Sequence, residues 1–228
     1  MKAYWFSKNG LTQQGSTCYE VRPEPYHQNG RIEPCENGLH ASEHPLEALC
    51  FAQGSNLTLD RVELGGTIVA HGDPPDKYAA SERTHLKRIP ADPILKEFAR
   101  WCALQVTHLW DCPPEVKQYL ETGDESLRDA VFAAIGHARI QAGRATDKPF
   151  ANIEEARACW AAHAAILAAS HATQQTAGWS TKYITWSAVT DAEQAIALIS
   201  TAAVIQDAKA AQRDHFKTLV DAAFEQAP

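Results

Sequence analysis

Up to about Pro90, apolar and polar residues alternate along the chain with a period of two. Because successive side chains of a strand point to opposite faces of a sheet, this alternation predicts β-strands. They cover AYWFS (3–7), STCYEV (16–21), LTLDRVEL (57–64), GTIVAH (66–71) and KYAASERTHLKRI (77–89). Turn residues at 8–10, 29–30, 65–66 and 72–75 separate them. In LTLDRVEL the alternation changes phase, which requires a bulge or a break near Asp60.

From Ala91 onward the apolar residues recur with helical spacing. Asp92 followed by Pro93 predicts a helix start, and Gly123 and Gly143 predict the ends of the second and third helices. Asn152 predicts the cap of a fourth helix with Trp160 on its buried face. The segment WSTKYITWSAV is also predicted to be helical, and Thr190 with Glu193 resembles a capping box that would start a terminal helix reaching about Phe224.

The change of pattern near residue 90 predicts two domains in an α+β protein. Residues 1–90 form a small, mostly antiparallel β-sheet domain with one helix, and residues 91–228 form an alanine-rich α-helical array. Alanine at helix contacts lets backbones approach closely, so we expect tightly stacked antiparallel helices. Alanine clusters recur in this half without a period that would establish a solenoid.

Net charge and composition limit the classes of binding partner and the cellular location that we expect. The formal net charge is −7, which argues against nucleic acid and anionic lipid as binding partners. No apolar run is long enough for a membrane span. The six cysteines show no C-x-x-C pairing, a pattern that favours reduced thiols in a cytoplasm over a disulfide framework. We therefore expect a cytoplasmic protein, with a homo-oligomer through the C-terminal helix left open.

One short stretch, HASEH (40–44), matches H-x-x-E-H, in which two histidines on one helix hold zinc. The surrounding residues favour another interpretation: a strand through Leu39–Ala41, an N-cap at Ser42, and a helix with Pro45 in its first turn. This arrangement separates His40 from His44 and places His44 at the periphery. We predict no metal site here.

Several ordered blocks resemble a family of uncharacterised phage and prophage proteins. They are CENGLHAS, RVELGGTIVAHGD, KYAASERTHL, FARWCALQVTHLWDCPP and YLETGDESLRDA, and they cover roughly residues 1 to 130. The resemblance implies an N-terminal domain of unknown function before a variable alanine-rich helical tail, and it carries no activity. HGDPPDKYAASERT departs from the family by a short loop insertion. The expectation is a phage-encoded, non-enzymatic accessory protein that binds and inhibits a host macromolecule, such as a defence component.

The alternative function is enzymatic. Gly38 to Ser42 resembles the strand end of ADP-ribosyltransferases, which implies NAD as cofactor, with His40 and Ser42 in the cleft. Such enzymes need a later glutamate to stabilise a cationic transition state, and Glu82 is the candidate because the alternation places it on the inward face. A structural ion pair of Glu82 with Arg61 or Arg31 is the competing interpretation.

The remaining candidates are aromatic side chains and scattered thiols and histidines. Trp179, Tyr183 and Trp186 recur at helical spacing, as either a buried stripe or a binding surface. Structural roles are favoured instead: a packed core for Cys102, a position at a helix end for His108 and Asp111, and hydrogen bonding for single histidines on alanine-rich helices. These residues are Cys102, His108, Asp111, Cys112, His137, His163 and His171.

Overall fold

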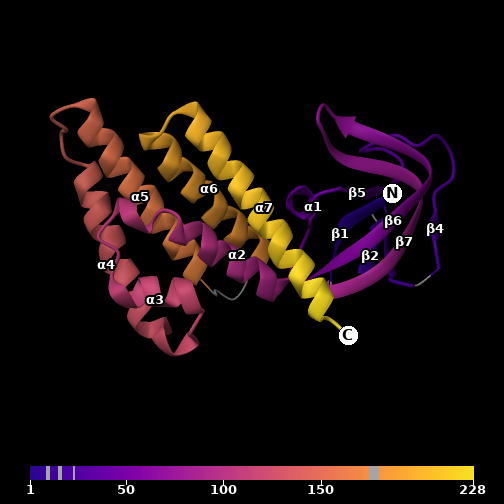
Figure 1. Ribbon diagram of the computed structural model, residues 1–228, viewed down its shortest axis with the longest axis horizontal. Coiled ribbons are helices and arrows are strands. Elements are labelled where there is room, and N and C mark those ends of the chain that lie inside the picture. The colour runs from indigo at the N-terminus through magenta and orange to yellow at the C-terminus, as the bar shows by residue number, and fades with distance from the viewer. Residues whose placement is uncertain (9–10, 15–16, 23, 175–179) are drawn as a thin grey trace. The chain divides into compact units, whose positions relative to one another are not determined.

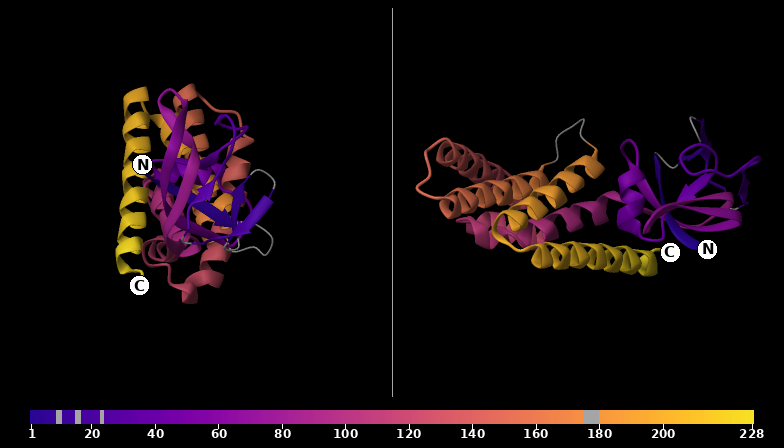
Figure 2. Two further views of the ribbon diagram at one scale, coloured as in Figure 1. Left: turned by 90° about the vertical axis from the view of Figure 1, so that its right-hand side faces the viewer. Right: turned by 90° about the horizontal axis from the view of Figure 1, so that it is seen from above.

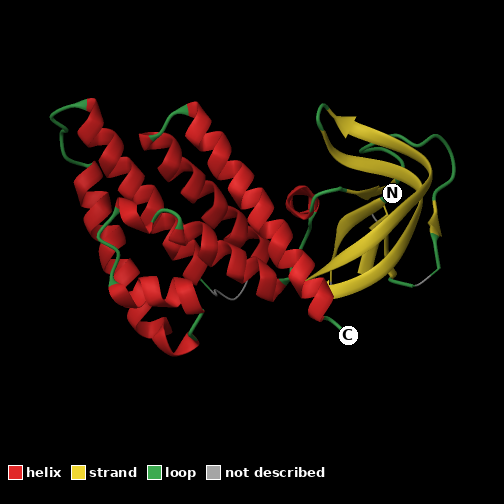
Figure 3. Cartoon of the chain, viewed as in Figure 1, coloured by secondary structure: helices red, strands yellow, loops and turns green. Residues whose placement is uncertain are grey.

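The computed structural model describes residues 1–8, 11–14, 17–22, 24–174 and 180–228, without the side chains of 11–14 and 17–19 (Figure 1). The chain packs as two compact units. The β unit comprises Met1–Ile94 together with Phe216–Pro228, and the helical unit comprises Leu95–His215. A sheet in the first unit and a set of helices in the second confirm the α+β class (Figure 3).

Across the residues described, the strands form one sheet in the order β3-β2-β1-β6-β7-β4, and β5 also pairs with β7. The pairings are antiparallel. β6 and β7 form a long curved hairpin that dominates the unit (Figures 1 and 2). The strands are β1 (Lys2–Lys8), β2 (Leu11–Gln14), β3 (Thr17–Glu20), β4 (Tyr26–His27), β5 (Leu39–Ala41), β6 (Leu57–Gly72) and β7 (Pro75–Pro90).

The β6–β7 hairpin tests two expectations about irregularity. The bulge expected near Asp60 is confirmed by a register shift between Arg61 and Val62. The turn expected at 65–66 is wrong, because β6 continues through both glycines with a second register shift before Ile68. A bulge absorbs the turn-forming residues without ending the strand. The predicted strands 57–64 and 66–71 are therefore one.

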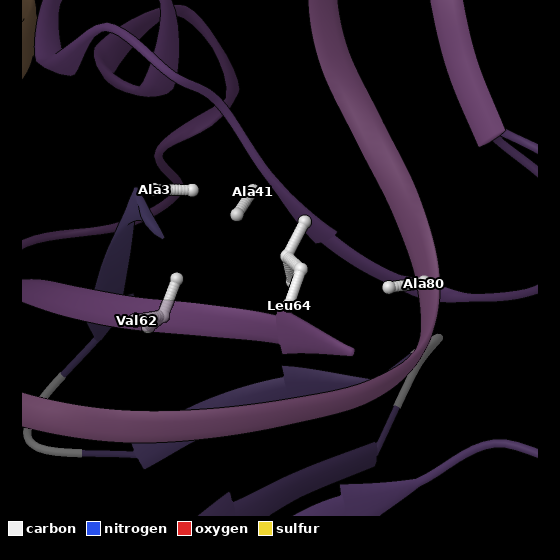
Figure 4. Close-up of a cluster of buried hydrophobic side chains, with 5 residues drawn as sticks. All are labelled: Ala3, Ala41, Val62, Leu64 and Ala80. Atoms are coloured by element: carbon white, nitrogen blue, oxygen red, sulfur yellow. The ribbon is translucent and has the colours of Figure 1, made fainter. Parts of the chain in front are cut away.

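A cluster of small apolar side chains fills one part of the β unit. Figure 4 shows its members converging from four strands, β1, β5, β6 and β7. Alanines at three of the five positions leave room for the strands to come close. The residues are Ala3, Ala41, Val62, Leu64 and Ala80, all buried.

Helix α1 (Pro45–Phe51) follows β5, as the sequence predicted, but it begins differently. Its N-cap is His44, whose Nδ1 accepts a hydrogen bond from the Leu46 N–H at 3.2 Å. The prediction of Ser42 as the cap is wrong, because Ser42 forms a backbone bridge with Tyr4 that holds it extended. His44 is buried, so its predicted peripheral position is also wrong.

The last part of the chain packs on the sheet of the β unit. Asp221 accepts hydrogen bonds from the Tyr4 hydroxyl at 3.1 Å and from Arg61 Nη2 at 2.7 Å. The Arg61 guanidinium lies 4.4 Å from the centre of the Phe224 ring. Phe216, Val220 and Phe224 recur every four residues and are buried. One stripe of the helix α7 (Ala202–Gln226) therefore belongs to the core of the β unit.

In the helical unit, α5 and α6 pack along each other in opposite directions, and α4 packs beside α5 (Figure 1). Six alanines on α5 and α6, Ala165, Ala168, Ala169, Ala188, Ala192 and Ala195, are fully buried, as expected for close backbone approach. The helices, including those shared with the β unit, are α2 (Asp92–Leu104), α3 (Pro114–Thr122), α4 (Arg128–Thr146), α5 (Ile153–Thr173), α6 (Thr181–Ile199) and α7 (Ala202–Gln226), with 3-10 turns at Thr107–Leu109 and Glu125–Leu127.

Local end signals were predicted well where their chemistry is specific. Gly123 ends α3 in the left-handed conformation with φ 69°, and the Asn152 side chain accepts from the Glu155 N–H at 2.8 Å. Gly143 does not end α4, which continues to Thr146. Trp160, predicted to be buried, is exposed.

The largest boundary error concerns Thr190 and Glu193. They lie inside α6, and α7 begins only at Ala202, after Ser200. Ala188, Ala192 and Ala195 on the buried side of α6 pack without interruption. This packing outweighs a local capping signal, because tertiary burial supplies most of a helix's stability.

Candidate functional site

The HASEH segment lies at the junction between β5 and α1. His40 is on β5 opposite Ala79 of β7, and His44 is the N-cap of α1. The two histidines therefore share no helical face, which confirms that expectation. In the parts of the chain that the structure describes, no group of three or more metal-ligating side chains comes together.

His40 is held in place by two neighbours. Its Nε2 accepts a hydrogen bond from the Cys35 N–H at 3.1 Å, and its carbonyl oxygen accepts one from Arg83 Nη1 at 2.6 Å. Burial, followed by the charges of Lys77 and Arg83, lowers the pKa of His40 to about 4. An imidazole that accepts at Nε2 is neutral, with its proton on Nδ1. The geometry and the lowered pKa thus agree.

Gly38 explains how the strand reaches this position. Its φ of +151° is unfavourable for other residues, and an added Cβ would lie 2.8 Å from the Ala79 Cβ. Only a glycine lets β5 pass this close to β7. Two residues past His40, Ser42 is buried, and its N–H and carbonyl bond to Tyr4 at 3.1 and 2.8 Å.

Glu82 does not lie on the inward face of β7. Its side chain is 46% exposed, and one carboxylate oxygen lies 3.7 Å from His27 Nδ1. The alternation that places Glu82 inward places Arg83 and His85 outward, but both are buried. The alternation misled the prediction because Arg83 and His85, although polar, lie close to the buried carboxylate of Asp60. The suggested ion pairs of Glu82 with Arg61 or Arg31 are also wrong.

The strand registers separate His40 from Glu82. β5 places His40 opposite Ala79, and β4 places His27 opposite Glu82. Three residues along an extended strand correspond to about 10 Å and to opposite faces. The structure therefore does not bring His40 and Ser42 together with Glu82 in one cleft.

A polar cluster that the sequence did not reveal lies between β1, β6 and β7. We define it as Ser7, Asp60, Arg83, His85 and Arg88. The fully buried Asp60 accepts hydrogen bonds from the Ser7 hydroxyl and from Arg88 Nε at 2.6 Å. His85 Nδ1 lies 3.5 Å from Asp60 Oδ2, the oxygen that also accepts from Ser7. One carboxylate thus binds Ser7 and Arg88 and lies close to His85.

Burial dominates the electrostatics of this polar cluster. It lowers the pKa of Arg83 to about 10, against the opposing effect of Asp60, and the guanidinium lies 4.6 Å from the centre of the Trp5 ring. Burial also lowers the pKa of His85, partly offset by Asp60. The side chains of Asp60 and His85 are almost inaccessible to solvent. We infer that the cluster stabilises the fold, since a substrate could not reach it.

Thiols and histidines of the helical unit have structural positions. Cys102 is fully buried, which raises the pKa of its thiol well above the usual value and makes it a poor nucleophile. The prediction of a packed core cysteine is confirmed. Burial raises the pKa of Cys112 to about 11. His171 Nδ1 lies 2.7 Å from Asp191 Oδ2, as expected for a hydrogen-bonded helix histidine.

The exposed side of α6 carries two aromatic rings. Tyr183 is 51% exposed and Trp186 is 36% exposed, whereas Ile184, Thr185 and Ala188 are buried. The interpretation of Tyr183 and Trp186 as part of a buried stripe is therefore wrong. Trp179 lies outside the residues that the structure describes. We call Tyr183 and Trp186 the aromatic pair.

Comparison with known proteins identifies one domain. Residues 1–97 match the family model described as "Domain of unknown function (DUF7666)". No curated protein and no solved structure matches the chain. The matched segment covers the strands of the β unit and about the first half of α2. Among the helices described, none is long and apolar enough to cross a membrane.

Proposed function

We propose that this chain is a non-enzymatic accessory protein, encoded by a phage, that binds and inhibits a bacterial host protein. The observation that carries the binding role is the exposure of the aromatic pair on α6. Tyrosine and tryptophan dominate binding hot spots because they bury a large area with little loss of side-chain entropy. Their three-residue separation places both rings on one side of the helix.

The partner chemistry follows from the two side chains. Each ring is apolar, and each carries a hydrogen-bond donor at its edge. A protein surface with an apolar groove and acceptor groups at its rim matches both properties. The chain's net charge of −7 argues against nucleic acid as the alternative partner.

The phage origin and the defence target rest on the sequence resemblance alone. Three of its five blocks, CENGLHAS, RVELGGTIVAHGD and KYAASERTHL, fall in the matched N-terminal domain, and the other two follow it. That domain is described as one of unknown function. A role in binding needs no catalytic residues. An inhibitor needs only to cover a surface of its target.

The enzymatic alternative has less support from the geometry. His40 and Ser42 are engaged in backbone-directed contacts, and Glu82 pairs with His27 about 10 Å along β7. Incubation with labelled NAD and bacterial lysate tests the alternative directly, with Glu82→Gln as the matched variant. Equal labelling by both proteins excludes transfer through Glu82, and labelling lost only in Glu82→Gln favours the enzyme.

A pull-down tests the proposed function. The native chain, Tyr183→Ala/Trp186→Ala, and the control Ile153→Ala, which alters an exposed apolar residue of α5, are each used to capture proteins from bacterial lysate. We expect one partner to bind the native chain and the control, and to bind the double variant at least tenfold less. Equal capture by all three proteins, or no reproducible partner, contradicts the proposal.

A further inference from the structure

Helix α4 presents an apolar face that none of the described residues of the helical unit covers. Phe132 is 71% exposed and Ile140 is 56% exposed, with Ala133 exposed and Gly136 half-buried between them. These four residues, which we call the α4 stripe, lie on one side of the helix. The opposite side, with Val131 and Ile135, is buried, and α4 packs against α5 and α3, its neighbours in Figure 1.

Such exposure is unusual for a phenylalanine, because its burial contributes roughly 1.5–3 kcal/mol. Contiguous exposed apolar side chains mark interaction surfaces. Gly136 adds a second property: a Cβ placed there would meet nothing within 4 Å. The centre of the stripe is therefore open to close approach by another backbone.

The charges on either side of the stripe have opposite signs. Asp129 lies one turn before Phe132, and Arg144 lies one turn after Ile140. Both side chains are exposed, and neither has an ion pair among the described residues. The midpoint of Asp129 and Arg144 falls between Gly136 and His137, and the midpoint of Ala133 and Ile140 falls at the same place.

We propose that a second copy of this chain docks on the α4 stripe, with the two α4 helices antiparallel about a two-fold axis between Gly136 and His137. A two-fold interface must be self-complementary, since the same patch contributes twice. The axis pairs Asp129 with the partner's Arg144, and Ala133 with the partner's Ile140. Each contact occurs twice, and antiparallel helix dipoles also attract.

A small pocket beside the stripe fits this arrangement. Its volume is about 230 Å³, and Tyr119, Asp129, Phe132 and Gln174 are among its lining residues. Arg128 also lines it, but its charge is engaged by Glu125. A carboxylate, an amide and an aromatic ring suit a guanidinium group. The antiparallel arrangement brings the partner's Arg144 to this end of the helix.

The order of charges selects a second copy over an unrelated partner. An acidic residue near the start and a basic residue near the end of one helix complement the same helix in the reverse direction. The surface is distinct from the aromatic pair on α6, so dimer formation and host binding can fail independently. A single helix pair buries less than the roughly 1,200 Å² of a standard interface, and we expect a dimer that dissociates on dilution.

Sedimentation velocity over a range of protein concentrations tests the dimer. We expect the native chain and Val204→Asp, a control at an exposed apolar site of α7, to dimerise equally. Ile140→Asp should weaken dimerisation at least tenfold, since it introduces two charges into the apolar centre. A native chain that is monomeric at every concentration, or a dimer that Ile140→Asp does not weaken, overturns the proposal.

Charge exchange gives the sharper test. Asp129→Arg and Arg144→Asp should each weaken the dimer at least tenfold, because each places like charges opposite one another. The double variant restores both ion pairs and should return to within about threefold of the native dissociation constant. A general loss of helix stability would not be rescued in this way. Single variants without effect, or a double variant no better than the single ones, overturn the antiparallel arrangement.

Discussion

The two units of this protein bury different kinds of side chain. The β unit encloses a carboxylate and a guanidinium, Asp60 and Arg83, together with His85. The helical unit encloses mainly alanine along α5 and α6, with Ala169 and Ala188 fully buried. The first unit must compensate desolvated charges, whereas the second depends on how closely two backbones approach.

This difference determines how each unit can be damaged. A buried charge destabilises the protein when its partner is removed, because an unpaired charge is costly in a medium of low dielectric constant. An alanine interface has no charge to lose, but it has no room for added atoms. Changes of charge should therefore damage the β unit, and changes of volume should damage the helical unit.

The largest expected effect is that of Asp60→Asn. The substitution keeps the size of the side chain and removes the negative charge that holds Arg88 and faces Arg83 and His85. We expect the free energy of unfolding of the β unit to fall by about 3–5 kcal/mol. Hydrogen exchange localises the change, with protection lost in β1, β6 and β7. Asp207→Asn, at an exposed site of α7, serves as the control, and equal stability of both variants contradicts the role of the polar cluster.

The next largest effect should come from Ala188→Leu in the helical unit. Ala188 is fully buried on α6, and three added carbon atoms must displace α5 or adopt a strained rotamer. We expect a loss of about 1–3 kcal/mol, seen by hydrogen exchange as faster opening of α5 and α6. Ala197→Leu, on the exposed side of the same helix, should change stability by less than about 0.5 kcal/mol. Similar losses for the two variants would show that the interface is loosely packed.

A smaller effect than that of Asp60→Asn should appear on acidification. The pKa of His85 in the folded state lies below its ordinary value of 6.5, because burial disfavours the cation among Arg83, Arg88, Asp60 and the Tyr26 ring. The unfolded chain therefore takes up the proton first. Stability is complete above about pH 6.5 and declines as the pH falls below it.

Urea unfolding at about pH 7.5 and about pH 5 measures this decline. His40, whose pKa is also lowered, contributes with the same sign. His85→Gln should reduce the difference between the two pH values, and His40→Gln/His85→Gln should reduce it further. The pKa of the partly exposed His215 in the helical unit is lowered by burial, and hydrogen exchange separates its contribution. A decline unchanged in both variants would exclude these histidines as its cause.

The smallest effect should come from a helix end, where neither buried charge nor close packing is involved. The Asn152 side chain accepts from the Glu155 N–H at the start of α5. Asn152→Ala should lower stability by about 1 kcal/mol, and Asn152→Gly by only a few tenths. Thermal unfolding of the two variants gives the order. A larger loss for Gly than for Ala would mean that backbone entropy, and not the cap, controls this position.

The features predicted correctly from the sequence depend on neighbours within a few residues. Pro93 at the start of α2, Gly123 at the end of α3 and Asn152 at the start of α5 act through local backbone chemistry. Alternation in the first half and helical spacing in the second give the α+β class. These signals need no knowledge of what packs against them.

The inward face of β7 could not be predicted in this way. Burial of Arg83 and His85 depends on Asp60, more than twenty residues earlier in the chain. Hydropathy selects Leu86 instead, which is half exposed at the register shift where Val62 pairs with His85 and Arg61 with Lys87. Unless the partner strand is known, the sequence does not show whether a charged residue is buried in an ion pair or exposed.

The exposure of the aromatic pair could not be predicted from the local sequence either. Spacing alone placed Tyr183 and Trp186 on one side of a helix, but the outward direction depends on which side meets α5. The buried alanines of α6 determine which side meets α5. Their packing also explains why α6 continues beyond Thr190 and Glu193. The exposure of a recognition surface is thus decided by the packing behind it.

The assignment of Phe216–Pro228 to the β unit has a consequence for the order of synthesis. The contacts of Asp221 with Tyr4 and Arg61, and of Phe224 with Arg61, join residues more than 150 positions apart. Domains usually fold as they emerge, N-terminal first. Here β1 and β6 are translated well before the helix that packs on them. The apolar face of the sheet stays uncovered while the whole helical unit is being made, and a ribosome-bound chaperone would find its substrate there.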